Sequence, residues 1–407
     1  MFRFDFEMGE VEESVAGTFS SAPSGSGASA SSHQQNAVQE DASREIPLES
    51  LLSALPHTFS FSPLAVPLAS KRNVVLSRRD LFDARFQVIA SDEDTHPRNG
   101  RTDLDFLDAP SDLVPGVYEG GLKTWECSLD LVDCLDSIYS TDVAEKLRGK
   151  RVLELGCGTA VPSLYLLQSI FSKPPSASSN IHIHLQDYND LALRLVTLPN
   201  VLLAWYMSPA SAAFRESAST PRADKMDDAD PDVEPEPLPQ VDTTEPGELP
   251  VTPQLTAAFI ESLRQYGVHL KFFSGSWSTF DVSKAGGPYQ VILTSETIYR
   301  QDSLGPLVDL MHRATALPTT SSQDSTASLA ESTSKLSIAD EANLRRLADE
   351  PYLCLVAAKV VYFGVGGGVS EFVRAVEEHK PKGTVRTIWE RIHGVKRSVM
   401  QVLWSSS

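Results

Sequence analysis

The stretch RVLELGCGTAVPSLYLLQSIF, residues 151–171, places a strand-like apolar run, a glycine turn and a second apolar run in sequence. Residues 151–155 are rich in strand formers, whereas residues 159–171 follow as a predicted helix. Gly156 and Gly158 lie between them and let the backbone turn tightly and approach a ligand closely. The first backbone N–H groups of the helix are unpaired, so the stretch predicts a ligand-binding loop. A dinucleotide is disfavoured, because Pro162 stands where its fingerprint has a third glycine.

Further strands and helices alternate along the chain on both sides of this stretch. Strands are predicted at 181–188, 268–275, 289–295 and 352–360, and helices at 128–139, 303–314 and 370–379. Two adjacent strand-like runs, 384–392 and 397–404, end the pattern. Strands separated by helices form parallel units with helices on both faces of the sheet. We therefore predict an α/β fold with a mostly parallel sheet and an antiparallel edge strand.

Composition divides the chain into an N-terminal extension, residues 1–111, and a catalytic-looking domain, residues 112–407. The low-complexity segment 12–44 predicts disorder, 44–56 a short amphipathic helix and 78–92 a structured arm. Two segments interrupt the domain: 208–252 is rich in prolines and acids, and 316–346 is rich in serine and threonine. Such residues disfavour a packed core, so both are predicted to be solvated insertions, and the end of the second can turn helical.

The net charge of −19 over 407 residues excludes some partners. Binding to a nucleic-acid backbone needs basic clusters, so we expect no direct nucleic-acid contact. An acidic chain suits a basic protein partner, which we therefore expect. The four cysteines lack metal-finger spacing, which indicates reduced thiols and no metal site. No apolar run reaches the ~18 residues of a membrane helix, and the N-terminus has no signal-like apolar stretch. We expect a monomer of the cytoplasm and nucleus that does not bind membranes.

Polar residues follow the predicted strands, at the edge where parallel sheets bind ligands. Asp187, with Tyr188 and Asn189, follows the second strand, where a carboxylate can accept both hydroxyls of a ribose or, alternatively, cap a helix. Gly275, Ser276 and Trp277 follow the third strand. The indole suits the flat face of an adenine, and the alternative is a core tryptophan that closes the sheet.

Two further segments, 294–299 and 359–368, each allow a functional and a structural interpretation. Residues 294–299, TSETIY, end an apolar strand and predict either substrate chemistry or a helix-capping box. Residues 359–368 carry four glycines in five positions but not the phosphate-loop pattern. Ordering so many glycines is costly, so the loop is either a flexible hinge or a backbone surface for a bound peptide. Trp125 and Glu126, before the first strand, could fold over a cofactor.

Together these segments resemble one family, the protein-histidine N-methyltransferases that modify a large-subunit ribosomal protein. The glycine loop ELGCGT resembles the first motif of class I methyltransferases. The resemblance runs from about residue 112 to 376, apart from the two insertions, and is carried by VPGVYEGGLKTWECSLDL, VLELGCG, LQDYN, TLPNV, FFSGSW, LTSETIY and YFGVGGGV. It implies a seven-strand, Rossmann-like methyltransferase fold with an N-terminal extension, and a role in ribosome biogenesis or translation.

The resemblance also implies S-adenosylmethionine as cofactor and the tele nitrogen of a protein histidine as the methyl acceptor. The implied cofactor contacts are Thr124, Trp125, Glu126, Cys127, Ser128, Gly156, Gly158, Asp187, Tyr188, Asn189, Gly275, Ser276, Trp277 and Ser295. Neutral imidazole carries a nucleophilic lone pair at physiological pH, so the site needs to orient the ring rather than supply a strong base. The candidates for that task are Glu296, Asn189 and Tyr299.

Two alternatives stay open at this point. Glu296-Thr-Ile-Tyr299 also fits the acidic-x-x-Tyr motif of related protein lysine methyltransferases. A lysine amine has an ordinary pKa of about 10.4 and must lose a proton before it can attack. The second alternative is a non-catalytic protein that binds S-adenosylmethionine and acts as a chaperone of a ribosomal protein.

Overall fold

The computed structural model describes residues 42–84, 87, 113–114, 118–119, 121–219, 238–317, 341–362 and 367–405. Three predictions lie wholly or partly outside these residues: the disorder of 12–41, the arm beyond residue 87, and the centres of the two insertions, 220–237 and 318–340.

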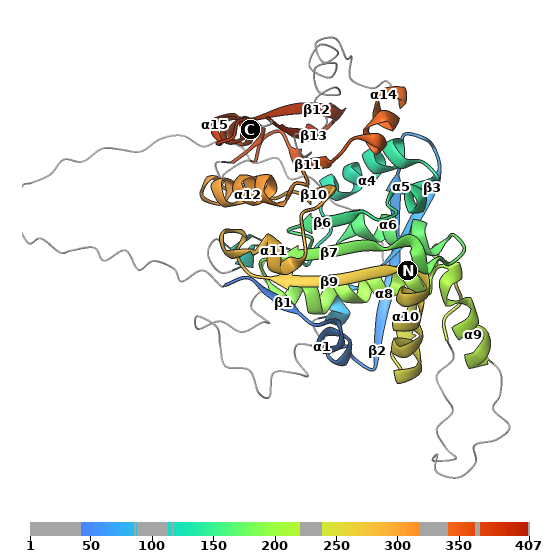
Figure 1. Ribbon diagram of the computed structural model, residues 1–407. Coiled ribbons are helices and arrows are strands. Elements are labelled where there is room, and N and C mark those ends of the chain that lie inside the picture. Colours follow the sequence, from blue (N-terminus) through green and yellow to red (C-terminus); the bar gives the residue numbers. More distant parts are fainter. Residues whose placement is uncertain are drawn as a thin grey trace, which may run out of the picture. The chain divides into compact units, whose positions relative to one another are not determined.

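The central sheet has eight strands in the order β1-β9-β7-β6-β10-β11-β13-β12 (Figure 1). Five neighbouring strands are parallel: β9 (Val268–Ser274), β7 (Ile181–Asp187), β6 (Arg151–Leu155), β10 (Val291–Ser295) and β11 (Leu353–Lys359). The antiparallel strand β13 (Arg397–Trp404) lies between β11 and the edge strand β12 (Gly383–Arg391). The mostly parallel, Rossmann-like sheet is therefore confirmed, and the final strand pair forms one end of it.

Side chains alternate between two apolar cores, one on each face of the sheet. In β11, Leu353 and Leu355 belong to one core, whereas Cys354 and Val356 belong to the other. This alternation follows from the two-residue repeat of a strand, and burial on both faces explains why the strands read as continuous apolar runs.

Helices cover both faces. The first core packs on α4 (Glu126–Tyr139), α5 (Val143–Lys146), α6 (Val161–Phe171), α8 (Leu198–Tyr206) and α10 (Pro253–Tyr266). The second core packs on α11 (Val282–Ala285), α12 (Gln301–Ala314) and α15 (Val369–Glu378). The shorter elements are α7 (Asp190–Ala192), α9 (Ala212–Ser219), α14 (Glu341–Arg346), β4 (Leu113–Val114), β5 (Tyr118–Glu119) and η4 (Trp277–Thr279).

The N-terminal segment is more structured than the sequence predicts. It contains β1 (Arg44–Ile46), the expected short helix α1 (Leu48–Ser53), and a hairpin of β2 (Thr58–Pro67) and β3 (Asn73–Arg79). Strand β1 extends the central sheet by pairing antiparallel with β9. The predicted boundary at residues 111 and 112 is therefore corrected, because residues 42–84 belong to the same compact unit as the domain.

The first insertion is also partly structured, which corrects the prediction of a solvated loop over 208–252. Its start forms α9, and its end forms β8 (Gly247–Pro250), which pairs antiparallel with β2. Phe59 of β2 faces Leu249 of β8, and both side chains are fully buried. Burial against β2 thus makes a strand from a segment whose local sequence does not favour one.

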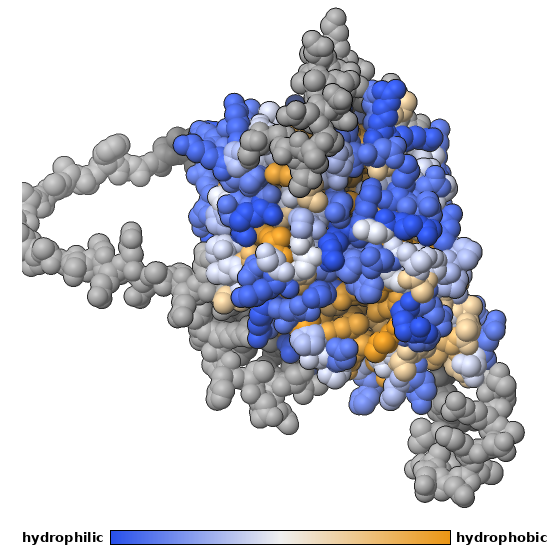
Figure 2. Space-filling model, in the orientation of Figure 1, coloured by the Kyte–Doolittle hydropathy of each residue, from blue (hydrophilic) through white to orange (hydrophobic). Residues whose placement is uncertain are grey.

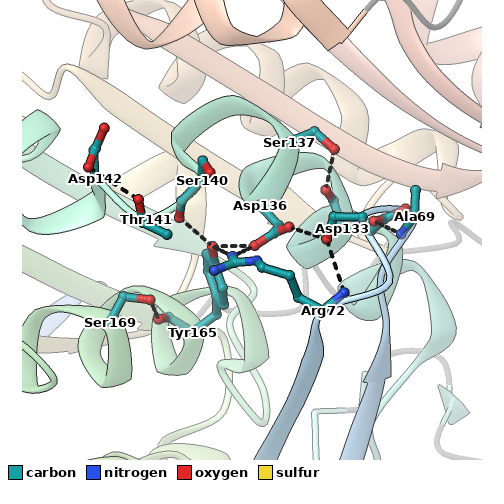
Figure 3. A network of polar contacts seen from close by, with 11 residues as sticks. Ala69, Arg72, Asp133, Asp136, Ser137, Ser140, Thr141, Asp142, Tyr165 and Ser169 are labelled. Atoms are coloured by element: carbon teal, nitrogen blue, oxygen red, sulfur yellow. Dashed lines mark hydrogen bonds and ion pairs between the residues drawn. The ribbon is translucent and has the colours of Figure 1, made fainter.

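Helix α4 connects the N-terminal hairpin to the C-terminal strands through three buried carboxylates. Figure 3 shows Asp133 and Asp136 facing the turn between β2 and β3. The backbone N–H of Ala69 donates to Asp133 over 2.6 Å, and Arg72 forms an ion pair with Asp136. On the other side, Arg397 of β13 forms an ion pair with Asp130. Each buried acid therefore has a polar partner, as buried carboxylates require.

Within the described ranges, no single helix is both long and apolar enough to cross a membrane, although one bent pair, 190–206 with 209–218, passes by length and composition. Figure 2 shows hydrophilic residues over most of the visible face. A band of apolar residues runs through the part where β9, α1 and α8 lie in Figure 1.

Candidate active site

The glycine loop after β6 lies against a second backbone segment. Gly156 and Gly158 have φ angles of +60° and +47°, which favour glycine. A Cβ on Gly158 would lie 2.9 Å from both the Cα and the carbonyl oxygen of Gly121. The segment that begins at Gly121 therefore crosses the glycine loop at a distance that only glycines allow.

Gln186, which the predicted site did not include, connects three parts of the cofactor side. Its side chain is fully buried at the end of β7. The amide oxygen accepts hydrogen bonds from Gly156 N (3.3 Å) and Trp277 Nε1 (2.8 Å), and the amide nitrogen donates to Gly275 O (2.8 Å). This one side chain sets the position of the glycine loop relative to the predicted adenine-side segment. Only its place at a strand end could have indicated it from sequence.

Asp187 and Asn189 have separate tasks at the end of β7. Asp187 accepts hydrogen bonds from Gly158 N (2.8 Å) and Asn189 N (3.1 Å), one on each carboxylate oxygen. The helix-capping task that was the alternative for Asp187 belongs instead to Asn189, whose side chain accepts from Leu191 N (3.0 Å). Contact between the Asp187 carboxylate and ribose hydroxyls stays a prediction.

The adenine-side segment follows β9. Gly275 has a φ angle of +99°, and Ser276 caps η4 by accepting from Ser278 N. Trp277 is half-buried and packs against the second core, which agrees with the structural alternative, and its contact with adenine stays a prediction. The ring of Tyr188, another predicted cofactor contact, is 38% exposed at the end of β7.

Residues 124–128 open α4 next to the glycine loop. Thr124 Oγ1 donates to Thr159 Oγ1 over 3.1 Å, which joins this segment to the loop. Trp125 is the residue before the helix, and Ser128 Oγ donates back to its carbonyl oxygen (2.6 Å). Cys127 is fully buried, whereas the Glu126 side chain is 57% exposed. Glu126 is thus placed to meet a ligand at the helix start.

Glu296 is the central side chain of the acceptor side. It follows β10 after half-buried Ser295, has a φ angle of +57°, and its side chain is only 6% exposed. The phenol of Tyr362 donates to its Oε2 over 2.6 Å. Its other oxygen, Oε1, is buried without a hydrogen-bond donor and lies 3.7 Å from the ammonium of Lys359. A buried carboxylate oxygen in this state is a ready acceptor for an N–H group.

Lys359, at the end of β11, connects the acceptor side to the cofactor side. Its Nζ lies 3.3 Å from Glu126 Oε2 and 4.9 Å from the centroid of the Trp125 ring. The ammonium is therefore shared between two carboxylates and an aromatic face. Neither Lys359 nor Tyr362 was among the predicted site residues, although both lie in the singled-out 359–368 segment.

The groups around Glu296 stay protonated at neutral pH. Burial, with Glu296 as the second cause, raises the pKa of the Tyr362 phenol well above its ordinary value. The same two causes raise the pKa of the Cys127 thiol. Tyr362 is therefore a hydrogen-bond donor to the carboxylate, and Cys127 is a neutral thiol rather than a nucleophile.

Tyr299 lies beside this cluster, and its backbone lies so close to the 359–368 loop that one position of the loop must be a glycine. Its ring centroid lies 6.3 Å from that of Tyr362, and its side chain is 8% exposed. A Cβ on Gly367 would lie 2.3 Å from the carbonyl carbon and oxygen of Tyr299. Close backbone contact with Tyr299 therefore requires a glycine there; residues 363–366 lie outside the described ranges.

The structure brings Glu296 and Tyr299 together but places Asn189 elsewhere. Asn189 follows β7, which is separated from β10 by β6. Strands lie about 4.8 Å apart, so Asn189 stands roughly two strand spacings from the Glu296 cluster. Its place in acceptor orientation stays a prediction. Among the described residues, no group of three or more His, Cys, Asp or Glu side chains is arranged to hold a metal ion.

Curated relatives share this chain's sequence over most of its length. "Histidine protein methyltransferase 1" of Saccharomyces cerevisiae is 32% identical over 340 residues, which are 80% of this chain and 75% of the yeast protein. The protein of that name in Schizosaccharomyces pombe is 29% identical, over 82% of this chain and 78% of its own. The "Histidine protein methyltransferase 1 homolog" of Bos taurus is 31% identical, over 72% of this chain and 57% of the bovine protein. No family model matches the chain.

Solved methyltransferase structures are more distant. A magnesium protoporphyrin IX methyltransferase from Synechocystis PCC 6803 with bound SAH has a TM-score of 0.28 and 8% identity, over 70% of this chain and 90% of its own. The N-terminal domain of EvdMO1 in the presence of SAH and D-fucose has a TM-score of 0.28 and 11% identity, over 80% of this chain and 97% of that domain. These values are low, so the fold assignment rests on the strand order described above.

The relatives and the strand order agree with the site. The glycine loop, the acidic strand end and the aromatic segment are joined by hydrogen bonds at the carboxyl ends of β6, β7 and β9, and their contacts with the cofactor stay predictions. The predicted enzyme class, protein-histidine methyltransferase, is confirmed by the yeast relative at 32% identity. The chain therefore belongs to the histidine protein methyltransferase family, and S-adenosylmethionine is its methyl donor.

Proposed function

We propose that the chain methylates the tele nitrogen of one histidine in a large-subunit ribosomal protein, and thereby acts in ribosome biogenesis or translation. The observation that carries the histidine chemistry is Glu296 Oε1, a buried carboxylate oxygen without a hydrogen-bond donor. A net charge of −19 is compatible with a basic protein partner. The monomeric state and the location in cytoplasm and nucleus stay predictions.

The cofactor-side residues fit S-adenosylmethionine in their chemistry. Asp187 offers carboxylate oxygens at the end of β7 that can accept from ribose hydroxyls, and Trp277 offers a half-buried ring for adenine. The glycine loop adds no side chain that would obstruct the methionine end of the cofactor. When bound, the cofactor supplies an electrophilic methyl group, so the protein has mainly to align the acceptor nitrogen with it.

The acceptor side fits a neutral imidazole. The tele nitrogen attacks through its lone pair, while the pros nitrogen keeps its proton and donates it to Glu296 Oε1. Tyr362 donates to the other oxygen, Oε2, over 2.6 Å, and the ammonium of Lys359 lies 3.7 Å from Oε1. As the methyl group transfers, the ring becomes a cation, and the nearby carboxylate stabilises this charge in a buried site.

Lys359 distinguishes this arrangement from a lysine-methyltransferase site. A substrate lysine would bring a second ammonium to a carboxylate that already has a cation 3.7 Å away. Repulsion between like charges in a buried site disfavours such binding. A neutral imidazole incurs no such repulsion on entry, so this geometry favours histidine as the acceptor.

The test maps the methylated residue. The full chain is incubated with labelled S-adenosylmethionine and large ribosomal subunits from cells that lack the enzyme, and mass spectrometry locates the label. We expect label on the tele nitrogen of a single histidine, and none with Gly156→Arg. Glu296→Gln should lower kcat about 100-fold and Tyr362→Phe about tenfold, with unchanged cofactor affinity.

A matched control is Tyr352→Phe, which removes a phenol that bonds Trp404 N outside the acceptor cluster. It should leave kcat unchanged. Label on lysine would contradict the histidine assignment and keep the methyltransferase fold. Cofactor binding with no transfer to any protein would favour the binding-protein alternative. Full activity in both Glu296→Gln and Tyr299→Phe would contradict the roles given to these side chains.

A further inference from the structure

We propose that Val361, Ile392 and Val395 form a docking surface for the protein substrate, next to the acceptor carboxylate. These residues are called the docking surface below. The proposal rests on the proposed function only in that the methyl acceptor is a protein. It adds where the rest of that protein binds and which kind of segment fits there.

The three residues come from two chain segments that are joined by backbone contacts. Val361 follows β11, and Ile392 and Val395 lie in the turn between β12 and β13. Val360 N donates to Lys396 O over 2.9 Å, and Lys359 pairs with Arg397 in the sheet register. Val361 also forms an isolated antiparallel bridge with Gly368. The docking surface therefore lies at the carboxyl end of β11, where the site is.

The exposure of these side chains is unusual for apolar residues. Val361 is 52% exposed, Ile392 65% and Val395 51%. Seven large apolar residues of the described ranges are exposed, and the other four are spread over separate segments: Phe82, Tyr188, Val241 and Ile260. Single exposed apolar residues are common, whereas clustered ones mark interaction sites.

The docking surface is continuous with the acceptor site. Val361 and Tyr362 are adjacent in the chain but differ in their surroundings, because Val361 is 52% exposed whereas Tyr362 is partly buried. Tyr362 points inward and donates to Glu296, whereas Val361 points to solvent. A peptide that places a histidine at Glu296 must leave the site past neighbouring surface. The docking surface is the apolar part of this neighbouring surface.

The chemistry of the surface defines the partner segment. Its apolar centre fits apolar side chains near the target histidine, since burial of apolar area is the main attraction in such contacts. Exposed Lys396 lies in the same turn, and Arg391 already lies 4.0 Å from Asp130. These cationic groups disfavour lysine or arginine in the docked segment, even if the substrate protein is basic as a whole.

The test compares a double variant, Ile392→Ser with Val395→Ser, with the control Ile260→Ser. Ile260 is 42% exposed on α10, which packs on β9 at the other end of the sheet. The probe is the purified protein in which the mapping experiment finds the methyl group, whether that group is on histidine or lysine. Steady-state kinetics, cofactor affinity and the thermal midpoint are measured for each variant.

We expect the double variant to raise KM for the protein substrate roughly tenfold, with kcat, cofactor affinity and thermal midpoint unchanged. The control should match the wild type. A KM within twofold of wild type would overturn the proposal, as would an equal rise in KM for the control. A change in oligomeric state in the double variant alone would overturn it in favour of a contact between copies of this chain. Absence of ribosomal methylation affects only the proposed substrate, because the probe is whichever protein is methylated.

Discussion

The cofactor side and the acceptor side of this enzyme are positioned by different kinds of contact. On the cofactor side, around β6, β7 and β9, positions are set by backbone contacts: Gly158 lies against Gly121, and Gln186 connects Gly156 to Gly275. On the acceptor side, after β10 and β11, positions are set by side chains, with Glu296 between Tyr362 and Lys359. The first side should therefore be sensitive to added atoms, and the second to changes of charge.

Two buried glutamates illustrate the difference. Glu154, in the strand below the glycine loop, accepts hydrogen bonds from the backbone N–H and hydroxyl of Ser163. Its partners are neutral, and burial raises its pKa to about 8. Glu296 has an ammonium 3.7 Å away in addition to its phenol partner. A buried carboxylate in a structural position is thus kept neutral, whereas the one near the acceptor position has a cationic partner.

The largest expected effect comes from Gly158→Ala, because the added Cβ would lie 2.9 Å from the backbone of Gly121. The glycine loop or the segment from Gly121 would have to move, and both lie at the cofactor position. We expect kcat/KM to fall about 100-fold or more, as displacement by about 1 Å in a site can cost that much. Isothermal titration with S-adenosylmethionine should show the same loss in affinity.

Gly149→Ala is the matched control for this prediction. Gly149 also has a positive φ angle, +70°, but a Cβ there would meet nothing within 4 Å. It should lower the free energy of unfolding by about 1 kcal/mol through backbone strain alone and leave the kinetics unchanged. Equal kinetic losses in both variants would show that backbone strain, and not close contact, controls the cofactor side.

The next effect concerns pH. Because the pKa of Glu154 rises from an ordinary value of 4.5 to about 8 on folding, the folded chain holds this proton more tightly than the unfolded chain. Its contribution to stability is therefore lost as the pH rises from about 4.5 to about 8. Glu154→Gln removes this loss. We expect its gain in free energy of unfolding over wild type to be about 4 kcal/mol larger at pH 8.5 than at pH 5.

Urea unfolding at both pH values measures this difference, and Glu245→Gln, at an exposed position, is the control. A gain that does not change with pH would mean that Glu154 is ionised in the folded chain. In that case the contrast between the two glutamates would be wrong.

The smallest expected effect is that of Asn189→Ala, which separates helix capping from orientation of the methyl acceptor. If Asn189 only caps α7, its loss should cost about 1 kcal/mol of stability and leave kcat within twofold. Differential scanning calorimetry and single-turnover kinetics measure the two quantities. A fall in kcat of tenfold or more, with cofactor affinity intact, would extend the acceptor side across β6 to the end of β7.

The parallel strands could be predicted from sequence because each is an apolar run buried on both faces, as in residues 291–295. Strand β8 could not, since GELP is strand-forming only when Leu249 is buried against Phe59. The glycine and acidic motifs of the cofactor side are local in sequence and were visible. Tyr362 was not identified as a site residue, because its task depends on Glu296, 66 residues earlier in the chain.

The carboxylates of α4 also have a consequence for how this chain folds. Asp136 and Asp133 find partners in Arg72 and Ala69, which leave the ribosome before the helix does. Asp130 pairs with Arg397, which follows it by 267 residues, and Asp133 accepts from the indole N–H of Trp389. Both partners are therefore synthesised long after α4. Contacts over such separations form slowly. During synthesis α4 therefore carries a half-neutralised acidic face, and the domain reaches its native state only after its last two strands have emerged.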